Sequence, residues 1–375
     1  MGRSIEMSPS PLDGELAPSC RAVVPTLPWD LKVQWSPGVL AALSDASRAI
    51  GRLEGARRAA NWSIESQGAL AAIEAWSCVL VAGMSARWGH VAREFAEDSL
   101  QWREPKTGAE AMATLIGFHL GLEGYGASRE CDGAISNEFY DGLVVSPHVR
   151  VSLMRGVHEW MESSSGADSA LLRSVLTMMY IAASCPESRE VGMVARVTFP
   201  WLLQSANGAD VLVPISLGFV NFSDEWDKVA RALAVDGRDD PDAVNEAVRC
   251  ALRAVERAAV TAGFEVESVK YGAQWHLNSQ HNAWFDEARP SVRHVFRAVY
   301  GLPSITRQNL EHLTGFSTRT VNTAVRILVE HGVVTVKGKV WGSAHYSVWS
   351  RRSRPPCLAS SSFYPSVSAA PDENR

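Results

Sequence analysis

The sequence lacks a run of about 18 apolar residues and a charged start leading into an apolar stretch, so neither a membrane span nor a secretory signal is expected. The cytoplasm is the expected compartment. The six cysteines are scattered and none form a Cys-x-x-Cys pair, so free thiols and no metal site are predicted. A phosphate-binding glycine loop, a dinucleotide fingerprint and an ordered Ser, His and Asp set are also missing.

The charge is unevenly distributed along the 375 residues. Between Arg289 and Arg354, eleven Lys and Arg stand against two acids, Glu311 and Glu330, for a net charge of +9. The whole chain carries −5, so the remainder carries −14. A basic segment on an acidic body is typical of a module that binds a polyanion. The alternative is a basic surface that docks on the acidic body.

Apolar periodicity predicts a mainly α protein, with helix-like spacing from Ser36 onward. Prolines among small polar residues predict flexible tails at both ends. The expected divisions are a tail over 1–35, an N-terminal helical region over 36–110, a helical core over 111–265, a separate unit over 289–349 and a tail over 350–375. Helices are expected over 69–83, 86–95, 110–122, 149–161, 170–184, 194–203, 223–235 and 242–262. The gaps at 124–147 and 204–222 leave room for small strands.

The segment 289–349 has a different pattern from the rest. A helix is expected over 290–300, Thr306 can cap a second that ends near Gly315, and Ser317 can cap a third that ends before Gly332. Residues 333–336 and 345–348 then alternate like strands, with Lys337-Gly338-Lys339 as the turn between them. Three helices followed by a hairpin predict a winged helix.

The third helix of this unit carries two different faces. Val321, Val325 and Leu328 share a face suited to the core. The other side and the expected turn carry the residues predicted to contact double-stranded DNA, namely Thr318, Arg319, Asn322, Thr323, Arg326, Lys337 and Lys339. Winged helices also serve as protein-docking or dimerisation modules, so a DNA contact and a protein contact are both open.

The twelve residues from Cys185 to Arg196 follow the apolar stretch 170–184. Their spacing resembles the signature loop of the Fic family (the Fido fold), His-Pro-Phe-x-Asp/Glu-Gly-Asn-Gly-Arg-x-x-Arg. Pro186, Gly192 and Arg196 match that signature. The positions of the family's His, metal carboxylate, Asn and middle Arg hold Cys185, Arg189, Val191 and Met193.

Flanking segments extend the resemblance over residues 36–349. Residues 43–55, which end in Gly-Arg-Leu-Glu-Gly, look like the family's N-terminal helix. Residues 74–83 are similar to its inhibitory segment, with Ala82 where the family has the Glu that pairs with the final loop Arg. Residues 117–119 and the segment from Ile215 to Trp226 also resemble the family, many of whose members carry a C-terminal winged helix.

A competing register of the signature starts at His119. It has a His, an acid and two glycines at matching intervals, but no Pro, Asn or final Arg. We therefore treat His119 as a structural helix residue.

The resemblance implies a protein that moves AMP from ATP to a hydroxyl of a protein target. The family's His acts as the general base, and loss of such a base costs on the order of 10²–10⁴ in rate. Arg189 at the carboxylate position would repel the Mg²⁺ that the family binds there, and Val191 has no side-chain donor for phosphate. An adenylyltransferase relative that is inactive or altered is therefore expected, with ATP as its nucleotide and Mg²⁺ disfavoured.

Arg196 and Cys185 each have two possible interpretations. Arg196, with Gly192 and Arg189, could bind an anion at the start of the helix, or Arg196 could form a structural ion pair with Glu187 or Glu190. Cys185 could be a nucleophile at a helix start beside arginines, or a small residue that fills the space of an imidazole.

Two functions follow from these patterns. One is a Fic-like protein with impaired catalysis, whose body binds a ligand or forms a homodimer. The other is a winged-helix transcription regulator whose body senses a ligand, which requires DNA binding that weakens steeply with salt.

Overall fold

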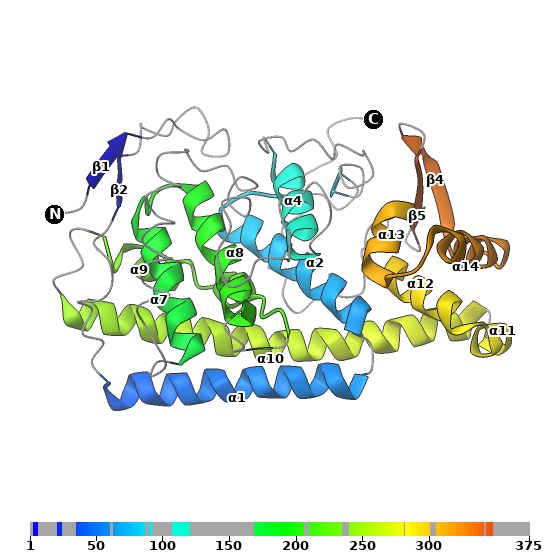
Figure 1. The fold of residues 1–375 in the computed structure, drawn as a ribbon. Coiled ribbons are helices and arrows are strands. Elements are labelled where there is room, and N and C mark those ends of the chain that lie inside the picture. The colour runs from blue at the N-terminus through cyan, green and yellow to red at the C-terminus, as the bar shows by residue number, and fades with distance from the viewer. Residues whose placement is uncertain are drawn as a thin grey trace, which may run out of the picture.

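The computed structural model shows a mainly helical protein (Figure 1). It describes residues 3–6, 21–24, 35–60, 63–86, 90–91, 107–120, 169–205, 209, 211–234, 240–280, 282–300, 305–340 and 343–347. None of the helices in these ranges combines the length and the apolar character that a bilayer span needs.

Two long helices, α1 (Pro37–Ala60) and α10 (Pro241–Gln280), run side by side along the base of the molecule (Figure 1). Buried residues recur every three or four positions along α1, the spacing of one helix face. They are Val39, Ala42, Ala46, Ala49, Ile50 and Leu53. Near its start, α1 lies against Arg249 of α10, since a Cβ added at Gly38 would be 3.5 Å from Arg249 Nη1.

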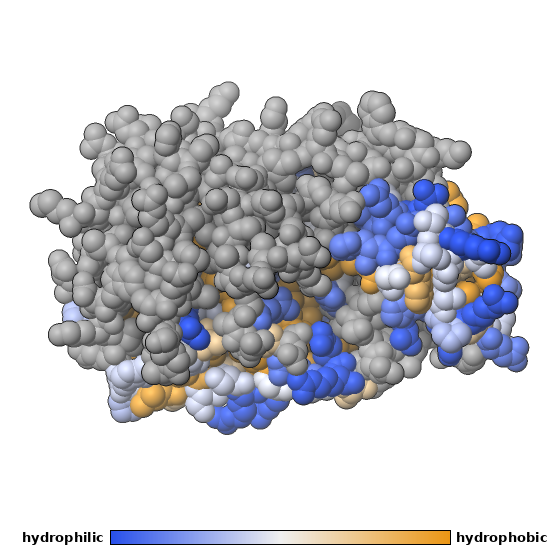
Figure 2. All heavy atoms as spheres, in the orientation of Figure 1, coloured by the Kyte–Doolittle hydropathy of each residue, from blue (hydrophilic) through white to orange (hydrophobic). Residues whose placement is uncertain are grey.

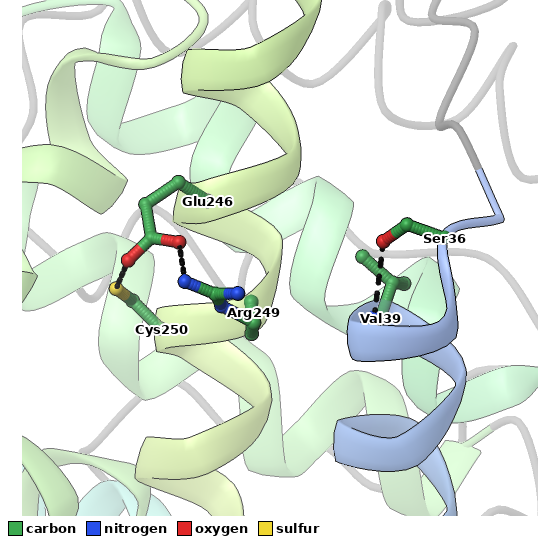
Figure 3. Close-up of polar contacts among 5 residues, drawn as sticks. All are labelled: Ser36, Val39, Glu246, Arg249 and Cys250. Carbon is green, nitrogen blue, oxygen red and sulfur yellow. Dashed lines mark hydrogen bonds and ion pairs between the residues drawn. The ribbon is translucent and has the colours of Figure 1, made fainter.

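Polar contacts fix the start of this helix pair (Figure 3). The Ser36 hydroxyl accepts a hydrogen bond from the Val39 amide at 3.3 Å and so caps α1. On α10, Glu246 pairs with Arg249 and accepts a hydrogen bond from Cys250 Sγ at 3.6 Å. Burial, with smaller contributions from Glu225 and Glu246, raises the pKa of Cys250 to about 11, so this thiol stays protonated.

The remaining body helices lie above α10 in Figure 1. They are α2 (Ser63–Val81), α4 (Gly108–Leu120), α7 (Ala170–Ala183), α8 (Arg189–Ser205), the 3₁₀ helix η2 (Ile215–Phe219) and α9 (Ser223–Arg231). Helix α2 packs on α4, α7 packs on α8, and α10 contacts both η2 and α9. One core therefore joins elements from both halves of the sequence.

The C-terminal elements form a unit beyond the end of α10 (Figure 1). They are α11 (Asn282–Glu287), α12 (Pro290–Tyr300), β3 (Ile305–Thr306), α13 (Arg307–Thr314), α14 (Thr318–Glu330), β4 (Thr335–Val340) and β5 (Ser343–Ser347). The strands form an antiparallel sheet in the order β3-β5-β4. On the face shown in Figure 2, hydrophilic residues alternate with hydrophobic ones over this unit and line much of the free edge of α1.

The helix ends predicted in this unit are confirmed. Thr306 accepts a hydrogen bond from the Asn309 amide at 3.2 Å, and Ser317 accepts one from the Thr320 amide at 3.4 Å. Helix α13 ends at Gly315, whose φ of 67° places it in the left-handed region that favours glycine.

The predicted hairpin turn at Lys337-Gly338-Lys339 is wrong, because these residues lie inside β4. Lys337 is opposite His345 and Lys339 is opposite Ala344, so the register shifts at Gly338. A glycine suits such a bulge as well as it suits a turn. The connection between the two strands follows Val340.

Other expectations have mixed outcomes. The described part of 204–222 holds η2 rather than a strand, and α10 continues 18 residues past the predicted end at Ala262. Within the expected N-terminal tail, β1 (Arg3–Glu6) pairs antiparallel with β2 (Arg21–Val24). The expected helix over 149–161, the gap at 124–147 and the C-terminal tail lie outside the described residues.

Candidate functional site

A tight loop over residues 184–188 joins α7 to α8, so the segment Cys185–Arg196 consists of this loop and the first two turns of α8. The Ser188 amide donates to the Cys185 carbonyl at 3.0 Å, and the Ser188 hydroxyl accepts from the Val191 amide at 3.3 Å. One of the amides that a helix start can offer to an anion is therefore already bound by the chain itself. Cys185 is 3% exposed and Val191 is fully buried, whereas Arg189 is exposed.

Arg196 is enclosed between three helices. It is 1% exposed, its Nη2 donates to the Cys78 carbonyl at 3.1 Å, and its guanidinium lies 4.4 Å from the ring centroid of Trp226. Its Nε has no hydrogen-bond partner within the described residues. A buried guanidinium with an unused donor is costly, and the stacking on Trp226 and the hydrogen bond to Cys78 offset part of that cost.

Gly192 makes room for this stacking. A Cβ added at Gly192 would lie 3.4 Å from Arg196 Nη1 and 3.4 Å from the Trp226 ring. Trp226 comes from α9 and contacts Phe219 edge-to-face, with centroids 5.3 Å apart. Gly192 thus lies against the internal Arg196–Trp226 pair.

A buried carboxyl lies one helical turn from Cys78 on α2. Glu74 is fully buried and accepts hydrogen bonds from the Ser216 amide at 2.9 Å and the Ser216 hydroxyl at 2.7 Å. Burial raises the pKa of Glu74 to about 7, although Ser216 and the positive charge of Arg196 lower it. Burial likewise raises the pKa of the Cys78 thiol.

The end of α2 lies near the start of α8. Ala82 is 7% exposed and its methyl group cannot pair with an arginine. A Cβ added at Gly83 would lie 4.0 Å from Arg189 Nη2, so Arg189 is the loop arginine beside this end of α2. Arg196 is held further back, by Cys78.

The ion pair suggested between Arg196 and Glu187 is wrong, because Glu187 pairs with Arg231 at 2.5 Å. The side chain of Glu190 lies outside the described residues. Arg196 is therefore stabilised by an aromatic ring and a carbonyl rather than by Glu187.

The residues present do not fit an ATP–Mg²⁺ complex. Arg196 is covered, Cys185 is buried, and the exposed group at the loop is the cation Arg189. Among the described residues, no three His, Cys, Asp or Glu side chains are grouped as a metal site requires. The burial of Cys185 also favours its packing interpretation over a nucleophile that meets a protein target.

His119 lies in α4, as predicted, and is 9% exposed. Burial lowers its pKa to about 3, so the imidazole is neutral over the physiological range. A structural position in the core agrees with this environment.

The two faces predicted for α14 are present. Val321 and Leu328 are fully buried and Val325 is 5% exposed, while Thr318, Arg319 and Asn322 are exposed. On the outer side, Arg326 lies 3.7 Å from Glu330, and the Thr323 hydroxyl donates to the Arg319 carbonyl at 2.9 Å. Lys337 and Lys339 are in β4, and their side chains lie outside the described part of the structure.

The sequence interpretation missed the contacts of Glu74 and Cys78. The sequence does indicate that Glu74 is unusual, because it is the only charged residue in the apolar stretch from Ala69 to Val81. A charge in such a run needs a buried partner. The partner, Ser216, is 142 residues away in the sequence and carries no signal of its own.

No protein-family profile matches the chain, and no curated protein matches it either. Solved structures do resemble it. One is the crystal structure of a Fic family protein from Desulfovibrio desulfuricans G20, with 13% sequence identity and a TM-score of 0.42. The match covers 85% of this chain and 98% of that chain. A likeness at this level does not assign a family.

Proposed function

We propose that this chain is a Fic-like protein whose helical body transfers no AMP and whose C-terminal unit is a winged helix that binds double-stranded DNA. The observation that carries the first part is the enclosure of Arg196, which is 1% exposed beneath Trp226 and Cys78. A phosphate could reach this guanidinium only after α8 and α9 had moved apart.

Long-range contacts support the Fic-like character of the body. Helix α2 and the turn after it resemble the family's inhibitory segment. They lie beside two arginines, Arg189 and Arg196, of the segment that resembles the signature loop. Cys78 binds Arg196, and Gly83 lies beside Arg189. The sequence resemblance placed these two segments together without any local pattern that joins them.

The loss of AMP transfer is tested with purified protein, α-labelled ATP and Mg²⁺. The expected result is no labelled protein, either of this chain or of added proteins from a cell extract. The matched variant is Cys185→His, which restores the family's base position. It is also expected to stay inactive, because Arg189 still excludes the metal and Arg196 remains covered. Label on the wild-type protein would refute the proposal.

DNA binding by the C-terminal unit is supported by the two faces of α14. Its inner face is anchored by Val321 and Leu328, and Ser317 caps its start. That start is where a recognition helix enters the major groove. The segment 289–354 supplies nine net positive charges for the phosphates.

Two exposed side chains are best suited to base edges. Arg319 and Asn322 are one turn apart on α14, and no contact of either side chain is present among the described residues. Arg prefers guanine and Asn prefers adenine in the major groove, so a site with neighbouring G and A is expected. Arg326 is held by Glu330 and is better placed for a phosphate.

The DNA proposal is tested by fluorescence anisotropy with random-sequence duplexes, followed by selection of preferred sites. Affinity should fall steeply as salt rises. Asn322→Ala should weaken binding to the selected site by about 1–3 kcal/mol and relax one base position. Glu267→Gln, an exposed change on α10, is the control. Absence of binding at low salt would favour a protein-docking role for the unit.

A further inference from the structure

A cavity that shares no lining residue with the Arg196 cluster lies between η2, the turn after it and α10. Its volume is about 330 Å³. Leu217, Val220, Phe222 and Val260 give it a largely apolar lining. Cavities of this size and character are typical of small-molecule sites.

Close backbone packing builds one wall of the cavity. A Cβ added at Gly218 would lie 2.0 Å from the Ala254 carbonyl oxygen, so η2 presses directly on α10. Only glycine permits this approach. The wall cannot move inward without disrupting α10.

Arg257 ties the two sides together. Its Nε donates to the Gly218 carbonyl at 3.0 Å, its Nη2 binds Glu225 at 2.5 Å, and its guanidinium lies 3.9 Å from the ring centroid of Phe222. These contacts join η2, the turn after it and α9 to α10 beside the cavity. Phe222 is nevertheless 42% exposed and Val260 41% exposed, so apolar surface remains available to an occupant.

The polar groups at the cavity favour a positive charge. The charge of Arg257 is balanced by Glu225. Glu256, by contrast, forms no hydrogen bond or ion pair within the described residues, and the same is true of the side chains of Asn221 and Thr261. An anion would meet the uncompensated carboxylate of Glu256, whereas an ammonium group would be attracted to it.

We propose that this cavity binds a small organic cation, an ammonium group on an aromatic or aliphatic body. The body would pack on Leu217, Val260 and the free part of the Phe222 ring, where burial of apolar surface favours binding. The ammonium group would lie at Glu256, with Asn221 and Thr261 as hydrogen-bond acceptors. This site is independent of the DNA-binding and AMP-transfer proposals.

The test uses phenethylamine as the probe, with phenethyl alcohol and hydrocinnamate as its neutral and acidic counterparts. Ligand-observed NMR titrations of the full chain measure each dissociation constant. Phenethylamine should saturate and bind most tightly, on the order of millimolar for so small a molecule. Hydrocinnamate should bind most weakly.

Two variants separate this site from adventitious binding. Glu256→Gln should weaken phenethylamine by about threefold or more and leave phenethyl alcohol unchanged. Val260→Trp should fill the cavity and abolish the binding of both phenethylamine and phenethyl alcohol, and a thermal melt verifies that this variant is folded. Glu267→Gln, exposed on the same helix, should change nothing. The proposal is overturned if phenethylamine does not saturate, binds no better than hydrocinnamate, or is unaffected by Glu256→Gln.

Discussion

The buried carboxyl of Glu74 should make this protein less stable as pH rises toward neutral, and Glu74→Gln should remove this pH dependence. In the folded state burial raises the pKa of Glu74 from 4.5 to about 7. Ser216 and Arg196 oppose that rise without cancelling it. Glutamine has nearly the same shape, keeps an oxygen toward Ser216 and has no charge to lose.

Proton linkage gives the sign and size of the contribution that Glu74 makes to the unfolding free energy. Below the unfolded pKa both states hold the proton, and the stabilising contribution is fully present. As pH rises, the unfolded chain releases the proton first, so the contribution is lost as pH passes through the folded pKa near 7. The difference between the two pKa values corresponds to about 3 kcal/mol.

Urea unfolding of wild type, Glu74→Gln and Glu267→Gln across this pH range measures the effect. From acid to neutral pH, the unfolding free energy of wild type should fall by about 3 kcal/mol relative to that of Glu74→Gln. Glu267→Gln should follow wild type, because Glu267 is exposed. A constant gap between wild type and Glu74→Gln at every pH would refute the reasoning.

Three further predictions concern stability and are measured by the same urea unfolding. Gly218→Ala should destabilise the protein by about 3 kcal/mol or more or prevent folding, because its Cβ would lie 2.0 Å from the Ala254 oxygen; Gly263→Ala, which has open space around it inside α10, is the control and should stabilise the protein by about 0.5–1 kcal/mol. Trp226→Ala should cost about 3–5 kcal/mol because it uncovers Arg196 and leaves a cavity; a loss below about 1 kcal/mol would mean that the stacking is unimportant. Ser317→Ala should cost about 1 kcal/mol through loss of the α14 cap, with no effect expected for Thr318→Ala beside it.

Local rules were enough to predict the ends of the C-terminal helices. Thr306, Ser317 and Gly315 act through hydrogen bonds or backbone angles within a few residues of their own positions. The bulge at Gly338 was not predictable in the same way. A glycine between two lysines suits a turn as well as a bulge, and only the pairing with β5 decides between them.

The site depends on contacts that no local pattern contains. The Arg196–Cys78 hydrogen bond spans 118 residues and the Glu74–Ser216 bonds span 142. The resemblance to the signature loop placed Arg196 and Gly192 in one candidate anion site, but it could not show that Trp226 would cover the guanidinium. Burial, rather than residue identity, changes the chemistry expected of Arg196.

The most direct test of the account is a calorimetric titration of the full chain with ATP, with and without Mg²⁺. The enclosure of Arg196 and the buried loop residues predict no saturable heat under either condition. Stoichiometric binding under either condition would contradict the account, because it would show that the loop opens to the nucleotide, and a requirement for Mg²⁺ would show in addition that the loop holds a metal despite Arg189.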